Sequence, residues 1–394
     1  MSDFEKDKGL IMDTYARFPV MFTEGKGVYV YDRDGKEYLD CGSGISVNNL
    51  GHCHPAVVAA IKKQAETLIH CSNLYWSEPQ FAVAAYLTQY SGLDRVFFCN
   101  SGAEANEGAI KLARKYFYDQ GKSEKYEIIT MEKSFHGRTL ATLTATGQEK
   151  VKTGFAPLPE GFRYAPFNDL PALEQGVTPH TCGVLLETVQ AEGGVYPAAE
   201  DYLKQVAAFC RENDLLLILD EIQCGMGRCG TMFAFEQYGI KPDIVTVAKA
   251  LGGGLPMGAV LAKEEIAKSF GHGSHGTTFG ANPVAAAAAQ AVFATIEEED
   301  LLSQVKTLGA YFKERLKELQ RAFPTLITDV RGKGLILGLE TPKNAGAVVN
   351  QCLKNGVILL LAGPDVVRFL PPFLITENEV DTVIAAVRAA LENL

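Results

Sequence analysis

Short, uniformly apolar runs alternate with longer stretches of mixed polarity through the middle of the chain. The apolar runs occupy residues 95–99, 127–130, 183–186, 215–219, 244–248 and 259–262. Each has the length of a strand, and a stretch with helical periodicity follows the first of them at 103–118. Strands that are apolar on both faces are typical of a mostly parallel sheet covered by helices. The pattern therefore predicts a large α/β domain.

A different pattern begins after about residue 282. It consists of two helical stretches and then two short apolar runs, at 283–297, 301–322, 334–340 and 366–370. Thr376 and Glu379 then have the spacing of a capping box at the start of a last helix. This order of elements predicts a second, smaller α+β domain.

The N-terminal part contains a predicted hairpin, residues 28–39, which turns at Gly35. We expect this hairpin to join the C-terminal elements. The smaller domain would then comprise residues 1–49 and 286–394, and the large domain would span residues 50–285.

Composition and charge narrow the possible partners. The chain has 394 residues, 47% of them hydrophobic, and a net charge of −10 without a cluster of Lys and Arg. This balance argues against nucleic acid or an anionic membrane as the main partner. The first six residues, Met-Ser-Asp-Phe-Glu-Lys, lack the features of a secretory signal, and no run is apolar enough to span a membrane. We therefore expect a cytoplasmic protein.

The cysteines and histidines do not indicate a disulfide framework or a metal site. The nine cysteines are scattered along the chain and form no CxxC pair, as expected for reduced thiols in a cytosolic enzyme. His52 and His54 flank Cys53 just before Pro55. Alternate residues on such a turn rarely face one metal ion together, so we predict no metal.

One glycine-rich run favours a different kind of protein. Gly225, Gly227 and Gly230 have the GxGxxG spacing of a dinucleotide-binding loop, which would indicate a nicotinamide-dependent dehydrogenase. In that fold the glycines follow the strand directly and open a long helix. Here residues 220–223 intervene, and residues 231–235 show no clear amphipathic pattern. The dehydrogenase remains a remote alternative.

Polar residues at the ends of three predicted strands offer a different chemistry, because open α/β sheets bind ligands at the carboxyl ends of their strands. The strand at 95–99 is followed by Ser101, Gly102 and Ala103, whose backbone N–H groups would open a helix and attract a phosphate. A capping box between Ser101 and Glu104 explains the same residues without a ligand.

Asp220 and Lys249 end the other two strands. A carboxylate after the apolar run 215–219 needs a cationic partner, and a protonated pyridine nitrogen would be one. An N-cap or an internal salt bridge explains the same residue without a ligand. An amine after the run 244–248 either reaches the solvent or, if it is desolvated, becomes a nucleophile that forms an imine. Together with the phosphate site, these are the three anchors that pyridoxal phosphate requires.

The sequence also resembles the class III, fold type I, pyridoxal-phosphate-dependent aminotransferases over nearly its whole length. The resemblance rests on Thr-Tyr-Ala-Arg-Phe-Pro-Val at 14–20, Gly-His-Cys-His-Pro at 51–55, Asn-Ser-Gly-Ala-Glu-Ala at 100–105, Phe-His-Gly-Arg-Thr at 135–139, Asp-Glu-Ile-Gln at 220–223, Thr-Thr-Phe-Gly at 277–280 and Arg-Phe-Leu-Pro-Pro at 368–372. Within the family it is most similar to the acetylornithine aminotransferases. The resemblance implies a large domain with a mostly parallel, seven-stranded sheet and a smaller α+β domain.

The resemblance implies pyridoxal 5'-phosphate held by Ser101, Gly102, Ala103, Phe135, Asp220, Glu221, Ile222, Gln223 and Lys249. Lys249 would bind the cofactor covalently and then act as the base that moves the substrate proton. Asp220 would pair with the ring nitrogen, Gln223 would approach the phenolic oxygen, and Phe135 would stack on the ring. Thr278 would reach the phosphate bound to the neighbouring subunit, which makes a homodimer the smallest active unit.

The resemblance also implies a substrate site formed by Tyr15, Arg138, Glu192, Thr277 and Arg368. Arg138 would bind the carboxylate far from the reacting amine, and Arg368 the α-carboxylate of glutamate. Glu192 would neutralise Arg368 while a terminal-amine donor is bound. Without the family pattern, the two arginines are better explained as structural charges, and Tyr15 as a packing residue.

The implied reaction transfers the terminal amino group of N2-acetyl-L-ornithine to 2-oxoglutarate, a step of arginine biosynthesis. Ornithine, succinyl-diaminopimelate, succinylornithine and 4-aminobutyrate are alternative donors, and a catalytically silent binding protein is the alternative outside enzymes.

Four positions depart from the usual family pattern and bear on the choice of donor. Thr188 stands where relatives commonly have Pro, Ala191 and Ala281 where Gly is common, and Cys229 where Thr is common.

Overall fold

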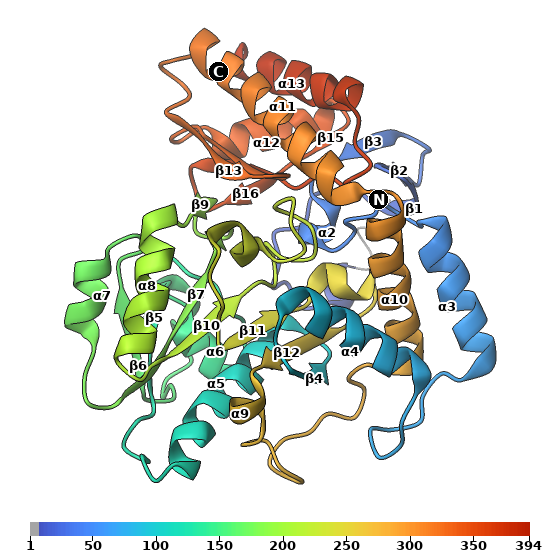
Figure 1. Ribbon diagram of the computed structural model, residues 1–394. Helices are drawn as coiled ribbons and strands as arrows, with labels where there is room; N and C mark the ends of the chain where they lie inside the picture. The colour runs from blue at the N-terminus through green and yellow to red at the C-terminus, as the bar shows by residue number, and fades with distance from the viewer. Residues whose placement is uncertain (1–7) are drawn as a thin grey trace.

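A seven-stranded sheet lies at the centre of the larger lobe in the computed structural model, which describes residues 8–394 (Figure 1). The strand order is β4 (Arg95–Cys99), β12 (Gly258–Ala262), β11 (Ile244–Val247), β10 (Leu216–Asp220), β7 (Thr181–Glu187), β5 (Glu127–Met131) and β6 (Phe162–Ala165). β12 is antiparallel to both of its neighbours, and the other pairs are parallel. The predicted mostly parallel sheet is confirmed.

Alternate residues of the central strands face two separate cores. Leu216 and Ile218 pack with the helix on one side, while Leu217 and Leu219 pack with the helices on the other. The first side is covered by α5 (Gly102–Asp119), and the second by α4 (Glu78–Ser91), α8 (Glu200–Glu212) and α10 (Pro283–Glu298). Burial on both faces is the reason for the uniformly apolar runs in the sequence.

The remaining short elements of the larger lobe are α3 (Pro55–Thr67), α6 (Leu140–Ala145), η2 (Glu149–Val151), α7 (Leu170–Gly176), β8 (Val189–Gln190), β9 (Tyr196–Pro197), η3 (Ala234–Tyr238), η4 (Lys249–Gly252) and α9 (Glu264–Ala267). The short 3-10 helix η3, rather than a long α-helix, follows the GxGxxG run. The structural context of a dinucleotide-binding loop is therefore missing.

The smaller lobe is built on a second, antiparallel sheet (upper part of Figure 1). Its strands are β13 (Asp329–Lys333), β14 (Ile336–Glu340), β17 (Val366–Phe369) and β16 (Leu360–Ala362), and its helices are α11 (Leu301–Ala322), α12 (Ala345–Lys354) and α13 (Glu377–Leu391). The predicted capping box is present, since Thr376 Oγ1 accepts a hydrogen bond from Glu379 N and Glu379 Oε2 accepts one from Thr376 N. The predicted α+β character of this segment is confirmed.

The N-terminal hairpin belongs to a third sheet, which includes a strand from the C-terminal segment. Its strands are β1 (Phe22–Lys26), β2 (Tyr29–Asp32), β3 (Glu37–Asp40) and β15 (Val357–Ile358). β15 is parallel to β3, so the hairpin strands share a sheet with a strand of the C-terminal segment. The exact division into residues 50–285 and the remainder stays a prediction.

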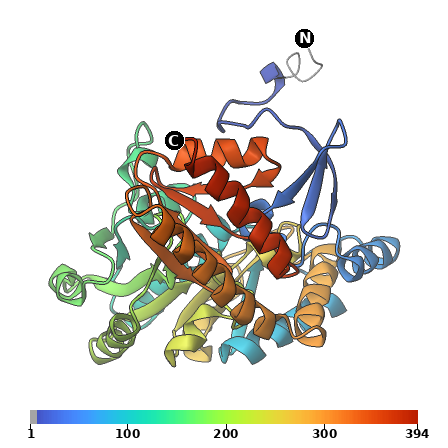
Figure 2. The same ribbon diagram turned by 90° about the horizontal axis from the view of Figure 1, so that it is seen from above.

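The segment before β1 contains the short turn η1 (Lys8–Leu10) and runs along the outside of the molecule (Figure 2). Nearly all residues from 9 to 19 are exposed. Residues 1–7, on which the prediction about a secretory signal rests, lie outside the described part. No helix within residues 8–394 is both long and apolar enough to cross a membrane.

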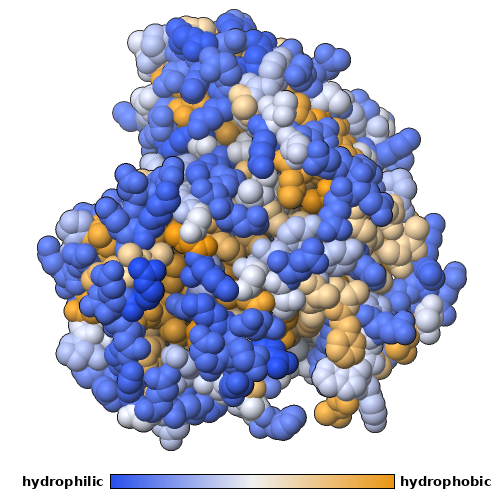
Figure 3. Space-filling view, in the orientation of Figure 1, coloured by the Kyte–Doolittle hydropathy of each residue, from blue (hydrophilic) through white to orange (hydrophobic). Residues whose placement is uncertain are grey.

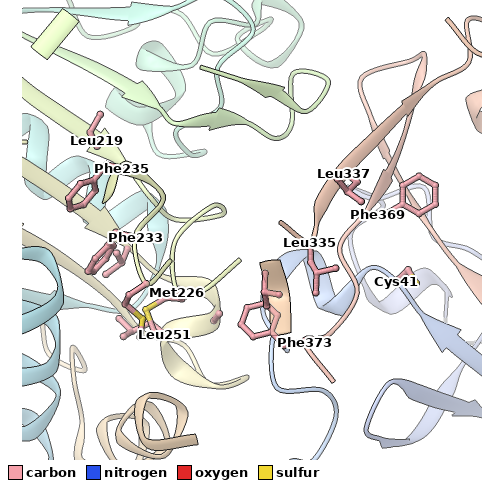
Figure 4. Close-up of a cluster of buried hydrophobic side chains, with 14 of the residues drawn as sticks. Cys41, Leu219, Met226, Phe233, Phe235, Leu251, Leu335, Leu337, Phe369 and Phe373 are labelled. Carbon is pink, nitrogen blue, oxygen red and sulfur yellow. The ribbon is translucent and has the colours of Figure 1, made fainter. Parts of the chain in front are cut away.

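One hydrophobic cluster is shared by the two lobes. Figure 4 shows Leu219, Met226, Phe233, Phe235 and Leu251 on the side of the larger lobe, and Cys41, Leu335, Leu337, Phe369 and Phe373 on the other side. The two lobes therefore share part of one core. The outer surface differs, because hydrophilic side chains cover most of the face drawn in Figure 3 and apolar ones gather in smaller areas.

The residues of the possible metal cluster have separate partners. His52 Nε2 lies 2.7 Å from Asp40 Oδ2, whereas His54 Nε2 lies 3.8 Å from Glu299 Oε1. All nine cysteines lie in the described part, and each is a free thiol.

Phe312→Ala is expected to lower the free energy of unfolding by about 3–5 kcal/mol, the usual loss for a fully buried phenylalanine. Phe312 is 0% exposed and packs edge-to-face on Phe369 with ring centroids 5.2 Å apart. Chemical denaturation followed by circular dichroism measures the change. Phe155→Ala is the matched control because Phe155 is 55% exposed; equal losses in the two variants would contradict the assigned core.

Candidate active site

Lys249 lies two residues after the end of β11, at the start of η4, and has a left-handed backbone, with φ of +49°. A non-glycine residue rarely adopts this conformation without compensation, and such strain is frequent at functional sites. Burial lowers the pKa of the Lys249 amine to about 8, although the nearby carboxylates act in the opposite direction. The charges that act on it are those of Glu192, Arg368, Asp220 and Glu187. About one amine in ten is therefore uncharged and nucleophilic at pH 7, against fewer than one in a thousand at the ordinary lysine pKa.

Asp220, the last residue of β10, is 3% exposed and is held by three donors. Its Oδ2 atom accepts hydrogen bonds from Asn106 Nδ2 at 2.7 Å and from His136 Nδ1 at 2.8 Å. Its Oδ1 atom accepts one from the backbone N–H of Ile222 at 3.0 Å. These bonds compensate for the loss of water around the carboxylate and fix its orientation.

The donors to Asp220 are themselves held by residues of the sheet. His136 Nε2 lies 3.1 Å from Thr130 Oγ1, and Asn106 Oδ1 accepts a hydrogen bond from Thr246 Oγ1 at 2.8 Å. The sequence analysis gave these four residues no role. They come from α5, β5, β11 and the loop after β5, and no spacing in the sequence indicates that they meet.

Glu187 ends β7 beside Asp220, its partner in the register of the two parallel strands. Burial raises the pKa of Glu187 well above its ordinary value, and the charge of Asp220 raises it further. A hydrogen bond of 3.2 Å from the backbone N–H of Phe135 to Glu187 Oε2 acts in the opposite direction. The pair can therefore hold one negative charge much more easily than two.

Arg368 on β17 reaches from the smaller lobe to two residues of the larger one. Its Nη1 atom lies 2.6 Å from Glu192 Oε1 and donates a hydrogen bond of 2.8 Å to Gln223 Oε1. Gln223 Nε2 in turn donates to Glu192 Oε1 at 3.0 Å. We call Glu192, Gln223 and Arg368 the Arg368 triad.

The triad holds an ionised carboxylate, and its arginine has a buried hydrogen-bond donor that could bind a further anion. Burial acts to raise the pKa of Glu192, but the charge and hydrogen bond of Arg368, together with Lys249 and Gln223, outweigh it, and the pKa is lowered. The Nε atom of Arg368 is buried and has no hydrogen-bond partner among the described residues. Such an orphaned charged donor is costly unless an acceptor such as a ligand carboxylate reaches it.

The start of α5 forms the third part of the site. Ser101 caps the helix, since its hydroxyl accepts a hydrogen bond of 3.2 Å from Glu104 N. Glu104 does not complete a capping box, because its carboxylate accepts from Asn100 N at 2.7 Å instead. The N–H groups of Gly102 and Ala103 have no acceptor within the helix and remain able to bind an anion.

Glycines allow a close approach of backbone around this helix start. A Cβ atom on Gly102 would lie 2.9 Å from the side chain of Ile222. Gly137 has φ of +141°, and a Cβ atom there would lie 2.9 Å from Ala103 Cβ. The start of α5 therefore lies against the turn that follows Asp220 and the segment that contains Phe135.

Other residues proposed from the sequence lie at the rim of this cluster or outside it. Arg138 is exposed, with its guanidinium carbon 5.6 Å from the centre of the Phe135 ring. Thr277 Oγ1 accepts a hydrogen bond of 3.1 Å from Asn100 Nδ2, whereas Thr278 is exposed. Tyr15 is 70% exposed and lines a separate hollow with residues of α12 and the loop between β15 and β16.

Glu221 does not direct its carboxylate to the cluster. Its oxygens accept hydrogen bonds from Ala234 N at 2.8 Å, Phe235 N at 3.0 Å and Thr188 Oγ1 at 3.2 Å. Burial raises the pKa of Glu221 to about 8. Its side chain therefore fixes the loop after β10, and any contact with a cofactor would be through its backbone.

The four positions that depart from the family pattern are all buried. The Thr188 hydroxyl lies 2.9 Å from Cys224 Sγ in addition to its bond to Glu221. The carbonyl of Ala191 accepts a hydrogen bond of 3.3 Å from Arg368 Nη1. Of the four, Ala191 therefore has a direct contact with the triad. Nothing in the structure explains the choice of Cys229 or Ala281.

Comparisons with known proteins agree with this arrangement. The family model described as "Aminotransferase class-III" matches residues 11–391. The acetylornithine aminotransferase of Methanocaldococcus jannaschii is 52% identical, over 96% of this chain and 95% of the relative.

Solved structures give the same picture. The N-acetylornithine aminotransferase of Stenotrophomonas maltophilia has a TM-score of 0.84 and 39% identity, over 96% of this chain and 97% of that one. An ornithine aminotransferase of Toxoplasma gondii, described with partial occupancy of PLP at its active site, has a TM-score of 0.94 and 32% identity, over 99% and 93% of the two chains.

Lys249 is expected to react with an amine-selective acylating reagent with a pH midpoint of about 8 in ligand-free protein. Because its pKa is lowered, the reactive free amine increases as the pH rises through that value. Peptide mass spectrometry of protein labelled between pH 6 and pH 11 measures the midpoint, with the exposed Lys62 as an internal reference for the reagent. A midpoint near 10.5 would contradict the desolvated amine.

Proposed function

Because the chain belongs to the class III aminotransferases, we propose that it transfers the terminal amino group of N2-acetyl-L-ornithine to 2-oxoglutarate with pyridoxal 5'-phosphate as cofactor. The products are N-acetyl-L-glutamate 5-semialdehyde and L-glutamate, as a step of arginine biosynthesis requires. The proposal rests on one observation: Lys249, Asp220 and the start of α5 all lie at the carboxyl ends of strands of the large sheet. The choice of donor is supported by relatives 52% and 49% identical, both named acetylornithine aminotransferase.

The residues at these strand ends fit the cofactor. Lys249 would hold it covalently, since burial brings the pKa of its amine to about 8. The carboxylate of Asp220 would face the ring nitrogen, and the N–H groups of Gly102 and Ala103 would bind the phosphate. A Cβ atom on Gly102 would be only 2.9 Å from Ile222, so a glycine is required where this cradle is tightest.

When bound, pyridoxal phosphate supplies an electron sink that stabilises negative charge at the substrate carbon next to nitrogen. Asp220, fixed by Asn106 and His136, would supply a negative charge to the ring nitrogen. The amine of Lys249 takes the proton from the substrate carbon and returns it later, which its lowered pKa allows near neutral pH. Phe135 would pack against one face of the cofactor ring and exclude water there.

The Arg368 triad would allow glutamate, which has an α-carboxylate beside its amine, and N-acetylornithine, which has an apolar chain there, to use one site. Arg368 would bind the α-carboxylate of glutamate, and its unpartnered Nε atom provides a donor for it. While N-acetylornithine is bound, Glu192 at 2.6 Å keeps Arg368 neutralised beside an apolar chain. Arg138, exposed at the rim, would bind the carboxylate that is distant from the reacting amine.

A homodimer is part of the proposal. Large exposed apolar side chains lie on the segment before α4 and on the loop that contains Thr278, namely Leu68, Ile69, Leu74, Tyr75, Trp76 and Phe279. Asn73 Nδ2 joins the two segments by donating to Thr277 O at 3.1 Å and Gly280 O at 3.2 Å. Several large exposed apolar side chains on two neighbouring segments are typical of an interface. A second copy of the chain would cover it, and Thr278 would complete the neighbouring phosphate site.

N-acetylornithine is expected to be the best amine donor in single-turnover experiments. The holoenzyme is mixed with N-acetylornithine, ornithine, succinylornithine, succinyl-diaminopimelate or 4-aminobutyrate, and the loss of the visible cofactor band is followed by stopped-flow absorbance. The largest kcat/KM should belong to N-acetylornithine. A larger value for another donor would contradict the substrate, while no loss of the band with any donor would contradict transamination.

Glu192→Gln is expected to lower the ratio of N-acetylornithine to glutamate half-reaction rates by about tenfold or more. The amide keeps the size of the side chain but leaves the charge of Arg368 uncompensated beside the apolar donor. Both rates come from the same absorbance measurement. Glu264→Gln, which removes a surface partner of Arg95, is the control. An unchanged ratio in Glu192→Gln would show that Glu192 is not the switch.

A further inference from the structure

Arg228, at the centre of the glycine-rich run, is 0% exposed. All of its hydrogen-bond acceptors among the described residues are uncharged oxygens. Burial lowers the pKa of its guanidinium to about 9. A buried cation without a carboxylate partner is costly, so its contacts have to compensate for a large desolvation.

The guanidinium of Arg228 joins three parts of the chain that lie far apart in the sequence. In the N-terminal segment, Nε donates to Ser46 Oγ at 3.0 Å and Nη2 donates to Asn49 Oδ1. In the smaller lobe, Nη1 donates to Leu335 O at 3.1 Å and Pro371 O at 2.5 Å. Arg228 itself belongs to the loop of the larger lobe after β10.

Two of these contacts connect Arg228 to the Arg368 triad through one intervening residue or segment. The hydroxyl of Ser46 accepts from Arg228 and donates to the backbone carbonyl of Gln223 at 3.2 Å. Pro371 lies three residues after Arg368 in the segment that leaves β17. Arg228 therefore contacts the segment that follows the strand of Arg368 and, through Ser46, the backbone of Gln223, the partner of Arg368.

The surrounding backbone allows little movement of this residue. Leu335 N donates to the carbonyl of Arg228 at 3.0 Å. Gly334 has φ of +52°, and a Cβ atom on it would lie 2.7 Å from that carbonyl oxygen. Phe373 lies against the guanidinium, with 4.9 Å from its ring centre to the guanidinium carbon. The turn of the smaller lobe is thus packed tightly on the loop of the larger one.

We propose that Arg228 is a positioning residue that sets the distance between Arg368 and Gln223 and thereby the affinity for the α-carboxylate of the glutamate substrate. This inference rests on the proposed function and assigns to it a residue that does not contact the substrate. Arginine suits the task because its planar guanidinium has five donors in a fixed geometry. Lysine presents a single flexible ammonium group and cannot reach the same four acceptors.

The test compares Ser46→Ala and Arg228→Lys holoenzymes with the unaltered holoenzyme. Ser46→Ala removes the link to Gln223 and leaves the other bonds of Arg228 in place. We expect it to raise KM for glutamate about fivefold, the usual effect of one lost hydrogen bond, with kcat and the KM for N-acetylornithine changed less than about twofold. Arg228→Lys should change KM for glutamate in the same direction and by more, about tenfold.

Ser91→Ala is the matched control, because Ser91 is also a buried serine with one backbone partner, Leu93 N at 3.1 Å. It lies at the end of α4, away from the triad, and should change neither KM. If Arg228→Lys does not fold, Ser46→Ala decides the outcome.

The outcomes separate this inference from the proposed function. Equal changes in both KM values, or no change in either, in Ser46→Ala would contradict the positioning role while transamination stands. If the unaltered holoenzyme turned over neither substrate, the proposed function would fail and the positioning role with it.

Discussion

The buried carboxylate of Asp220 is the interaction on which the candidate site depends. At 3% exposure it has lost nearly all its water, and an ionised carboxylate persists in such a place only when donors surround it. Asn106 from α5 and His136 from the loop after β5 provide these donors. The raised pKa of the neighbouring Glu187 limits a second negative charge at the same edge. The hydrogen bonds to the carboxylate of Asp220 therefore help to fix the positions of α5 and of the segment that contains Phe135.

Much of the fold follows from local patterns of polarity. The six apolar runs became strands because both faces of the sheet are covered by helices, and the capping box at Thr376 and Glu379 correctly marks the start of α13. β6 was not found, because at the edge of the sheet its Arg163 and Tyr164 are exposed and break the uniform apolar pattern. The pairing of β3 with β15 joins residues more than 300 positions apart, which no local pattern encodes.

The candidate site was predictable to a different degree for each part. Asp220, Lys249 and the start of α5 were predicted from their places at the ends of strands, whereas Glu192 and Arg368 were predicted from the family resemblance. Sequence reasoning missed the donors to Asp220, because their roles arise only when separate elements meet. It also left the GxGxxG run without a role, although Arg228 within it joins the two lobes. The spacing of residues in the sequence indicates only local geometry, and hydrogen bonds between distant segments produce no pattern in the sequence.

We propose above all that Lys249 and Asp220 form one cofactor site at the carboxyl ends of the sheet strands. The most direct test is borohydride reduction of the holoenzyme, followed by digestion and mass spectrometry of the peptides. We expect a reduced pyridoxyl group on Lys249 and on no other lysine, with the visible absorption band lost at the same time. A pyridoxyl group on a different lysine, or a visible band that survives reduction, would contradict it.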